Sequence, residues 1–339
     1  MQEKKIEKER EKKFDIITIG DSTIDTFIKI HDASIECDIN HEECKICVRY
    51  GDKIPVDSIS QSVAGNAANV AVAVATVGLK CAIYTNLGND SQGALIKKTL
   101  TTRGVYDEYI HTLDDKHSNL SVILTFQGER TAFVYHQPWF YHLPDLAPCS
   151  WVYFTSLSQS FTDSNIIDEV AHYIDRSGAK LAFSPGTFQI RANIKRYPKT
   201  LERCELLICN LEEAKQILEI DLVERVPVRE LLDKMLALGP KLIVLTDGEE
   251  GSYATDGESY LKVGVFPTKL VEKTGAGDAY ASAFIAALIY NQEIADAMVW
   301  GTINASAVIR ELGAQNGLLT HEEIEIHRKV VPELVAVNL

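Results

Sequence analysis

Thr274-Gly275-Ala276-Gly277-Asp278 leads directly into residues 279–288, an apolar run rich in small side chains. The run predicts a buried helix, and glycines at its start leave backbone N–H groups free to bind an anion. A phosphate there would also lie at the positive end of the helix dipole. Asp278 could then accept the proton of a hydroxyl group that attacks the phosphorus atom. The alternative for this stretch is a tight turn with a helix-capping aspartate.

Strands and helices alternate along the rest of the chain. Phe14–Ile19 and residues 82–85 are short apolar runs typical of buried strands, and residues 66–77 between them predict a helix that ends before Gly78. Further strand candidates stand at 151–155, 180–183, 206–209 and 241–246, with helix candidates at 211–218 and 228–238. This alternation predicts an α/β fold with a doubly wound, mostly parallel sheet and helices on both faces.

Two segments interrupt the alternation, residues 31–63 and residues 106–137. The second contains a hairpin signal, because two apolar runs flank Gln127-Gly128-Glu129-Arg130. Both segments predict a small β lid. The lid would be inserted in one domain of residues 14–330, preceded by a charged extension at residues 1–13.

Composition narrows the function classes. A chain of 339 residues that is 46% hydrophobic can bury one large core. Its apolar runs fall short of the roughly 20 residues that a membrane span needs, so no membrane partner is expected. The net charge of -14 disfavours nucleic acid as a partner. Residues 1–13 lack the apolar core of a secretion signal, which favours a cytoplasmic location.

Seven scattered cysteines argue against a secreted disulfide framework. Cys37, His41, Cys44 and Cys47 lie within the predicted lid at a spacing that zinc could use. The alternative is that reduced cysteines pack within the lid.

The first stretch resembles the C-terminal signature of the ribokinase, or PfkB carbohydrate kinase, family. The family's Asp-Thr-x-Gly-Ala-Gly-Asp stands here as Glu272-Lys273-Thr274-Gly275-Ala276-Gly277-Asp278. The resemblance implies a ribokinase-like fold, Asp278 as the catalytic base, and Gly275, Ala276 and Gly277 as the anion hole. Glu272 replaces the usual aspartate in a region that often helps to hold a monovalent cation, so a requirement for K⁺ stays open.

The N-terminal signature is similar as well. The family's Gly-Gly-x-x-x-Asn appears as Ala64-Gly65-Asn66-Ala67-Ala68-Asn69, and Ala64 departs from the first glycine. The resemblance implies that Gly65, Asn66 and Asn69 line the acceptor pocket, and that Asp25 accepts hydrogen bonds from substrate hydroxyls. Arg130 would reach the acceptor or the phosphates from the lid. The alternatives are a capping Asn66, an Asp25 on a solvated loop and a solvated Arg130.

Further motifs resemble the family's nucleotide region. Asn210-Leu211-Glu212-Glu213 matches an Asn-x-x-Glu element, which implies that Glu213 holds Mg²⁺ through water, although Asn210 could simply cap a helix. Residues 246–251 match a nucleotide-binding loop, Asn304 falls where the family has an adenine-side residue, and Gly313-Ala314-Gln315 continues the match. The implied nucleotide-binding residues are Asn210, Thr246, Gly248, Gly251 and Asn304.

The resemblance implies a kinase that transfers the γ-phosphoryl group of ATP to a sugar hydroxyl, with ATP and Mg²⁺ and with K⁺ left open. A nucleoside acceptor is the alternative within the family. An inactive protein that binds nucleotide or a partner is the alternative of another class. A dinucleotide-dependent oxidoreductase does not fit, because residues 20–25 lack Gly-x-Gly-x-x-Gly. Pairing of lid strands could produce a homodimer.

Overall fold

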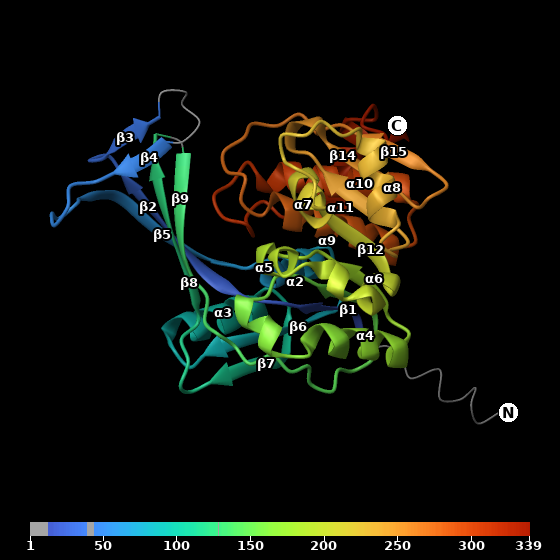
Figure 1. The fold of residues 1–339 in the computed structure, drawn as a ribbon, viewed down its shortest axis with the longest axis horizontal. Helices are drawn as coiled ribbons and strands as arrows, with labels where there is room; N and C mark the ends of the chain where they lie inside the picture. The colour runs from blue at the N-terminus through green and yellow to red at the C-terminus, as the bar shows by residue number, and fades with distance from the viewer. Residues whose placement is uncertain (1–12, 39–43, 128) are drawn as a thin grey trace.

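The computed structural model describes residues 13–38, 44–127 and 129–339, and a ten-stranded sheet forms its centre (Figure 1). The strands are, in spatial order, β16 (Val337–Asn338), β15 (Tyr260–Val263), β14 (Ser252–Thr255), β13 (Ile243–Thr246), β12 (Cys204–Asn210), β11 (Lys180–Phe183), β10 (Cys149–Phe154), β1 (Phe14–Ile19), β6 (Cys81–Gly88) and β7 (Tyr106–Leu113). Strands from β13 to β7 pair in parallel, and β14 to β16 add an antiparallel edge. The predicted mostly parallel sheet is confirmed.

Helices cover both faces of this sheet, as predicted. One apolar cluster lies under α2 (Asn66–Thr76), α3 (Ser91–Thr102), α9 (Ala276–Ile289), α10 (Ile294–Val308) and α11 (His321–Val330). A second cluster on the opposite face includes side chains of α4 (Ile166–Ser177), α5 (Thr187–Arg191), α6 (Pro198–Glu202), α7 (Leu211–Ile217) and α8 (Val228–Leu236). Because both faces are covered, the central strands are buried along their length, which explains their continuous apolar sequences.

The order in which successive strands are added to the sheet reverses between β1 and β10, which are themselves parallel. From β1 the chain proceeds to β6 and β7 on one side, then returns to β10 and continues toward β13 on the other. The segments that leave β1 and β10 meet there, because Asp21 N donates to Ser156 O at 2.9 Å. Open α/β sheets bind ligands at such a point, beyond the carboxyl ends of the strands.

Glycines start the two helices that reach this point. Gly275 precedes α9 with φ 82°, and a Cβ atom there would lie 2.4 Å from the Cβ of Ala314. Gly65 precedes α2 with φ 99°, and its Cβ would lie 2.5 Å from Asp21 O. Both positions therefore demand glycine for conformation and for space.

A four-stranded sheet forms the lid beside the main sheet, at the upper left of Figure 1. Its order is β5 (Val56–Ala64), β2 (Thr23–Ile30), β8 (Asn119–Phe126) and β9 (Glu129–Tyr135). The predicted limits of the lid need correction at two places. Residues 23–30 belong to the lid because β2 pairs with β5 and β8, whereas residues 106–113 form β7 and pair with β6 in the main sheet.

The chain after residue 330 also joins the main sheet. β16 pairs with β15, and Leu339 N donates to Tyr260 O at 2.8 Å. The sheet therefore extends beyond residue 330, the domain limit expected from the sequence. A strand of two residues that is held by backbone pairing has no sequence pattern from which it could be predicted. The expected N-terminal extension lies almost wholly outside the described residues.

The lid carries a disulfide where zinc or reduced thiols were expected. Cys37 and Cys44 face each other across the strand pair β3 (Ser34–Cys37) and β4 (Cys44–Cys47), and they form a disulfide. Cys47 is free, and His41 lies outside the described residues. Within the described ranges, no group of three or more His, Cys, Asp or Glu residues is placed to hold a metal ion. None of the described helices combines the length and apolar character that crossing a membrane requires.

Candidate active site

A cavity of about 470 Å³ lies where β1 and β10 end, between the main sheet and the lid. Its walls come from the β1–β2 turn, the start of α2, the lid strands, the segment after β10 and the loop that leads into α9. The structure brings together in this cavity the predicted residues Asp25, Gly65, Asn66, Asn69, Arg130, Gly275 and Asp278.

Asp278 lies in the first turn of α9 and is 8% exposed. Asn66 Nδ2 donates to its Oδ1 at 3.1 Å, and Asn69 Nδ2 donates to its Oδ2 at 2.8 Å. The two asparagines share a face because they are three residues apart on α2. Burial raises the pKa of Asp278 to about 7, the two amides oppose this shift, and the charge of Glu213 adds to it. A carboxyl with this pKa can serve as a base near neutral pH.

The start of α9 offers donors beside open space. Ala279 N bonds to Gly275 O at 2.8 Å, and Ala276 N is turned toward Lys273 O at 3.3 Å. The next N–H groups, of Gly277 and Asp278, belong to the helix start that has no partner within the helix. A Cβ atom on Gly277 would meet no atom within 4 Å. An anion can therefore approach these donors, whereas the N–H group of Ala276 contributes to the turn.

Arg130 connects the lid to the loop before α9. Its guanidinium on β9 donates to the Glu272 carboxylate and to the Thr274 hydroxyl. Thr274 also donates to Glu272 Oε1, from N at 3.1 Å and from Oγ1 at 2.7 Å. Arg130 is thus an anchored lid residue, and it compensates the charge of Glu272, whose side chain is 12% exposed. The carboxylate expected in the monovalent-cation region is therefore paired with Arg130 in this structure.

Asp25 and Asp21 place two further carboxyl groups in the cavity. Asp25 lies on lid strand β2 and not on a solvated loop, and burial raises its pKa while the Ser121 hydroxyl and Arg130 lower it. Asp21 was not predicted. Tyr141 Oη donates to it at 2.8 Å, Ser158 N donates at 2.8 Å, and burial raises the pKa of Asp21 to about 7. Its one sequence signal was the position beside Gly20, directly after the first strand.

An aromatic pair forms another part of the cavity wall. The rings of His136 and Phe188 meet edge to face with centroids 5.2 Å apart, and both residues line the cavity. Burial lowers the pKa of His136, which favours the neutral ring. Neither His136 nor Phe188 was among the site residues predicted from the sequence.

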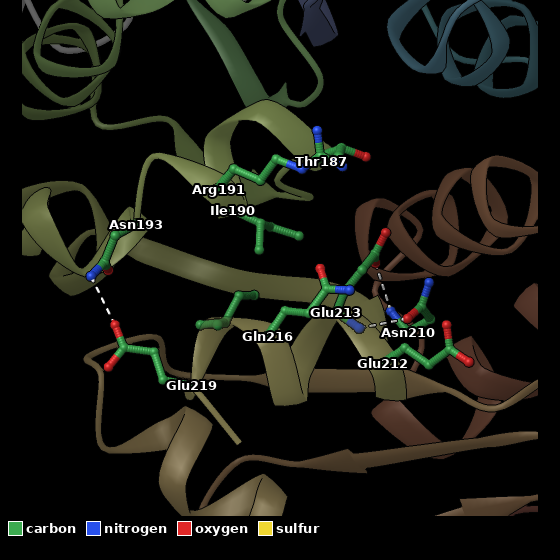
Figure 2. A pocket seen from close by; sticks show the side chains of 10 residues that line it. Thr187, Ile190, Arg191, Asn193, Asn210, Glu212, Glu213, Gln216 and Glu219 are labelled. Atoms are coloured by element: carbon green, nitrogen blue, oxygen red, sulfur yellow. Dashed lines mark hydrogen bonds between the residues drawn. The ribbon is translucent and has the colours of Figure 1, made fainter. Parts of the chain in front are cut away.

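A second cavity of about 540 Å³ lies between α5 and α7 (Figure 2). Asn210 Oδ1 accepts from Glu213 N at 2.8 Å, and Glu213 Oε2 accepts from Asn210 N at 2.9 Å, so the two residues cap α7 reciprocally. Burial raises the pKa of Glu213. Thr187 lines both cavities. Glu213 offers carboxylate oxygen in the second cavity, which suits Mg²⁺ that keeps its own waters.

The other predicted nucleotide residues line neither of these cavities. Thr246 ends β13, and Gly248 begins the turn that follows, with φ 50° and open space around it. Gly251 meets a packing demand, because a Cβ atom there would lie 2.0 Å from Val263 O. Asn304 is fully buried, donates to Ala279 O at 2.9 Å and accepts from Leu319 N at 3.1 Å. It joins α10 to α9 and is closed to a nucleotide here, which corrects its predicted role.

Comparisons with known proteins agree with this architecture. Residues 26–321 match the family described as pfkB family carbohydrate kinase. The chain is 26% identical to the ribokinase of Bacillus subtilis over 283 residues, covering 82% of this chain and 91% of that protein. It is 26% identical to the 5-dehydro-2-deoxygluconokinase of Shouchella clausii over 335 residues, covering 93% and 95%. The structure of Arabidopsis thaliana ribokinase complexed with ribose and ATP has a TM-score of 0.78 at 18% identity, covering 93% and 99%.

Proposed function

This chain belongs to the pfkB family of carbohydrate kinases, and from that premise we propose that it transfers the γ-phosphoryl group of ATP to a hydroxyl group of a sugar. One observation carries the proposal. The Asp278 carboxylate lies in a cavity wall, held by two asparagine amides, and its neighbour Gly277 opens the start of α9 to an anion. A carboxylate and open backbone donors thus lie side by side, which supports their use as base and phosphate site in phosphoryl transfer.

The polar lining of the cavity supports a polyol as the acceptor. Asp21 and Asp25 offer carboxylate oxygens, and Asn66 offers an amide. Such groups exchange hydrogen bonds with hydroxyls, and they disfavour ligands that leave them unpaired. Relatives named for ribose and for a deoxygluconate derivative support a sugar or a sugar acid. The edge-to-face pair of His136 and Phe188 favours a nucleoside as the second candidate, because a base could pack on it.

In the proposed reaction, the acceptor oxygen forms a bond to the γ-phosphorus atom, and the bond from that phosphorus to the bridging oxygen of ADP breaks. Asp278 takes the hydroxyl proton as the new bond forms. The N–H groups at the start of α9 stabilise the charge on the transferred group. Arg130 holds the lid over the acceptor, which limits transfer to water.

Glu213 would hold Mg²⁺ through water, and the ion, when bound, supplies positive charge that neutralises the phosphates of ATP. Thr246 and Gly248 are proposed to lie along the nucleotide. Glu272 is already paired with Arg130, so we expect turnover without a specific need for K⁺. A homodimer through the lid and a cytoplasmic location remain proposals from the sequence.

The test is ADP release with ATP and Mg²⁺ over a panel of sugars, sugar acids, sugar phosphates and nucleosides, with the wild type and Asp278→Asn compared. Turnover on a sugar that collapses in the variant supports the proposal. Turnover on nucleosides alone selects the second candidate. Binding of ATP without turnover on any acceptor indicates a protein that binds nucleotide without catalysis and contradicts the proposal.

A further inference from the structure

Gln315 contacts the proposed base through a single intermediate side chain. Its Nε2 donates to Asn69 Oδ1 at 3.1 Å, and Asn69 Nδ2 donates to Asp278 Oδ2 at 2.8 Å. The exposed fractions of Gln315, Asn69 and Asp278 are 8%, 5% and 8%. Three segments far apart in the sequence therefore form one buried chain of hydrogen bonds.

Hydrogen-bond chemistry fixes which group donates and which accepts at each step from Gln315 through Asn69 to Asp278. An ionised carboxylate can only accept, so Asn69 must turn its NH₂ group toward Asp278. The amide oxygen of Asn69 then faces away from the base, and a buried oxygen without a donor is destabilising. Gln315 supplies that donor. A flipped Asn69 amide would instead present its oxygen to the carboxylate, which would repel the charge that the base needs.

The segment that carries Gln315 is itself fixed. The backbone oxygen of Gln315 accepts from Arg103 Nη2 at 2.8 Å. The preceding residue, Ala314, lies against Gly275 so closely that a Cβ atom on the glycine would be 2.4 Å from the alanine Cβ. One short segment thus supports both the loop at the phosphate site and, through Asn69, the proposed base.

We infer that Gln315 is a positioning residue, which fixes the Asn69 amide with its NH₂ group toward Asp278 while the acceptor hydroxyl loses its proton. The inference rests on the proposed function and deepens it. Gln315 does not line the cavity, so it acts through Asn69 and not on the substrate. Asn66 is the other donor to Asp278, and Glu213 and Tyr153 are the titratable groups that interact with it from α7 and β10.

Two substitutions at Gln315 separate removal of the donor from reversal of the amide. Gln315→Met keeps the length of the side chain and removes the donor. Gln315→Glu, when ionised, can only accept, so it draws the NH₂ group of Asn69 away from Asp278. We expect kcat to fall about tenfold in the first variant, equivalent to one hydrogen bond of about 1.4 kcal/mol, and further in the second. The KM for ATP should stay within about twofold of wild type.

The control and a double variant test whether the effect passes through Asn69. Asn316→Ala removes an exposed amide of the same loop, which donates to Leu312 O, and it should leave kcat unchanged. In an Asn69→Leu background, Gln315→Met should cost nothing more, because the residue it orients is gone. An equal further loss in that background would overturn the inference and assign Gln315 to loop stability alone.

A measurement without turnover separates this inference from the proposed function. Carboxyl ¹³C NMR of aspartate-labelled protein, with the Asp278 signal assigned by Asp278→Asn, follows its titration directly. The midpoint should move to higher pH in Gln315→Met and further in Gln315→Glu, and unchanged midpoints would overturn the inference. If Gln315→Met does not fold, Gln315→Glu decides. A wild type without turnover on any acceptor refutes the proposed function and leaves this titration as the test of Gln315.

Discussion

Replacing Asp278 with asparagine should make the protein more stable at pH 8 while it strongly lowers kcat. Burial raises the pKa of this carboxyl from 3.8 to about 7. Between these values the folded protein holds a proton that the unfolded chain has lost, so the free energy of unfolding of the wild type falls as pH rises through this window. At 1.36 kcal/mol for each pH unit, the cost above pH 7 reaches about 4 kcal/mol.

Asparagine carries no charge and avoids this cost. Its single carbonyl oxygen can accept from one of the two asparagine amides, and the lost partner costs about 1–3 kcal/mol. The net stabilisation expected at pH 8 is therefore about 1–3 kcal/mol. At pH 5 the advantage should be smaller by about 2 kcal/mol or more, because the wild-type carboxyl is still protonated when folded. Loss of a general base should lower kcat by about 10²–10⁴-fold.

Urea unfolding of the wild type and Asp278→Asn at pH 5 and pH 8 measures this difference. Asp115→Asn is the matched control, because the Asp115 side chain is 82% exposed and its replacement should give the same small change at both values of pH. A stability difference for Asp278→Asn that does not grow between pH 5 and pH 8 would refute the reasoning from burial. Retained turnover in that variant would refute the role of the carboxylate as base.

Arg130→Ala should raise the KM for the acceptor about tenfold and increase ATP hydrolysis without acceptor, since it breaks the link between the lid and the loop before α9; an unchanged KM would count against lid anchoring. Gly275→Ala should lower both stability, by about 1–3 kcal/mol, and kcat, because it adds a clash with Ala314 to a strained φ. Gly104→Ala is the control, because Gly104 has φ 84° and free space around it, so the variant carries the backbone strain without the clash. An equal loss of stability in Gly104→Ala and Gly275→Ala would exclude the clash with Ala314 as its cause. Exchanging KCl for NaCl should change kcat/KM by less than about twofold, and a strict need for K⁺ would show that the charge of Glu272 is not compensated by Arg130 during turnover.

Local patterns in the sequence predicted the elements that carry the site. Parallel strands buried on both faces give continuous apolar runs, and the predicted runs fall within or overlap β1, β6, β10, β11, β12 and β13. The glycine before α9 was found for the same reason, since a helix start is a property of neighbouring residues. The roles expected of Asn66 and Asn69 came instead from the resemblance to the family's N-terminal signature.

Pairing between strands that are distant along the chain was harder to predict from the sequence. The sequence suggested one lid segment at residues 106–137, yet β7 within it joins β6 in the main sheet. The pairing of Cys37 with Cys44 likewise depends on the register of β3 against β4. Asn304 looked like a nucleotide contact until its amide was found between α9 and Leu319.

The sequence by itself determined the alternation of elements, the glycine-rich helix start and the carboxylate beside it, because each depends on residues close together along the chain. Only the tertiary structure decided the environment of that carboxylate. Asn69 and Asp278 are separated by 209 positions, and Asn69 and Gln315 by 246. Burial and the orientation of an amide arise from packing between such distant segments, and they set the pKa and the hydrogen bonds of Asp278.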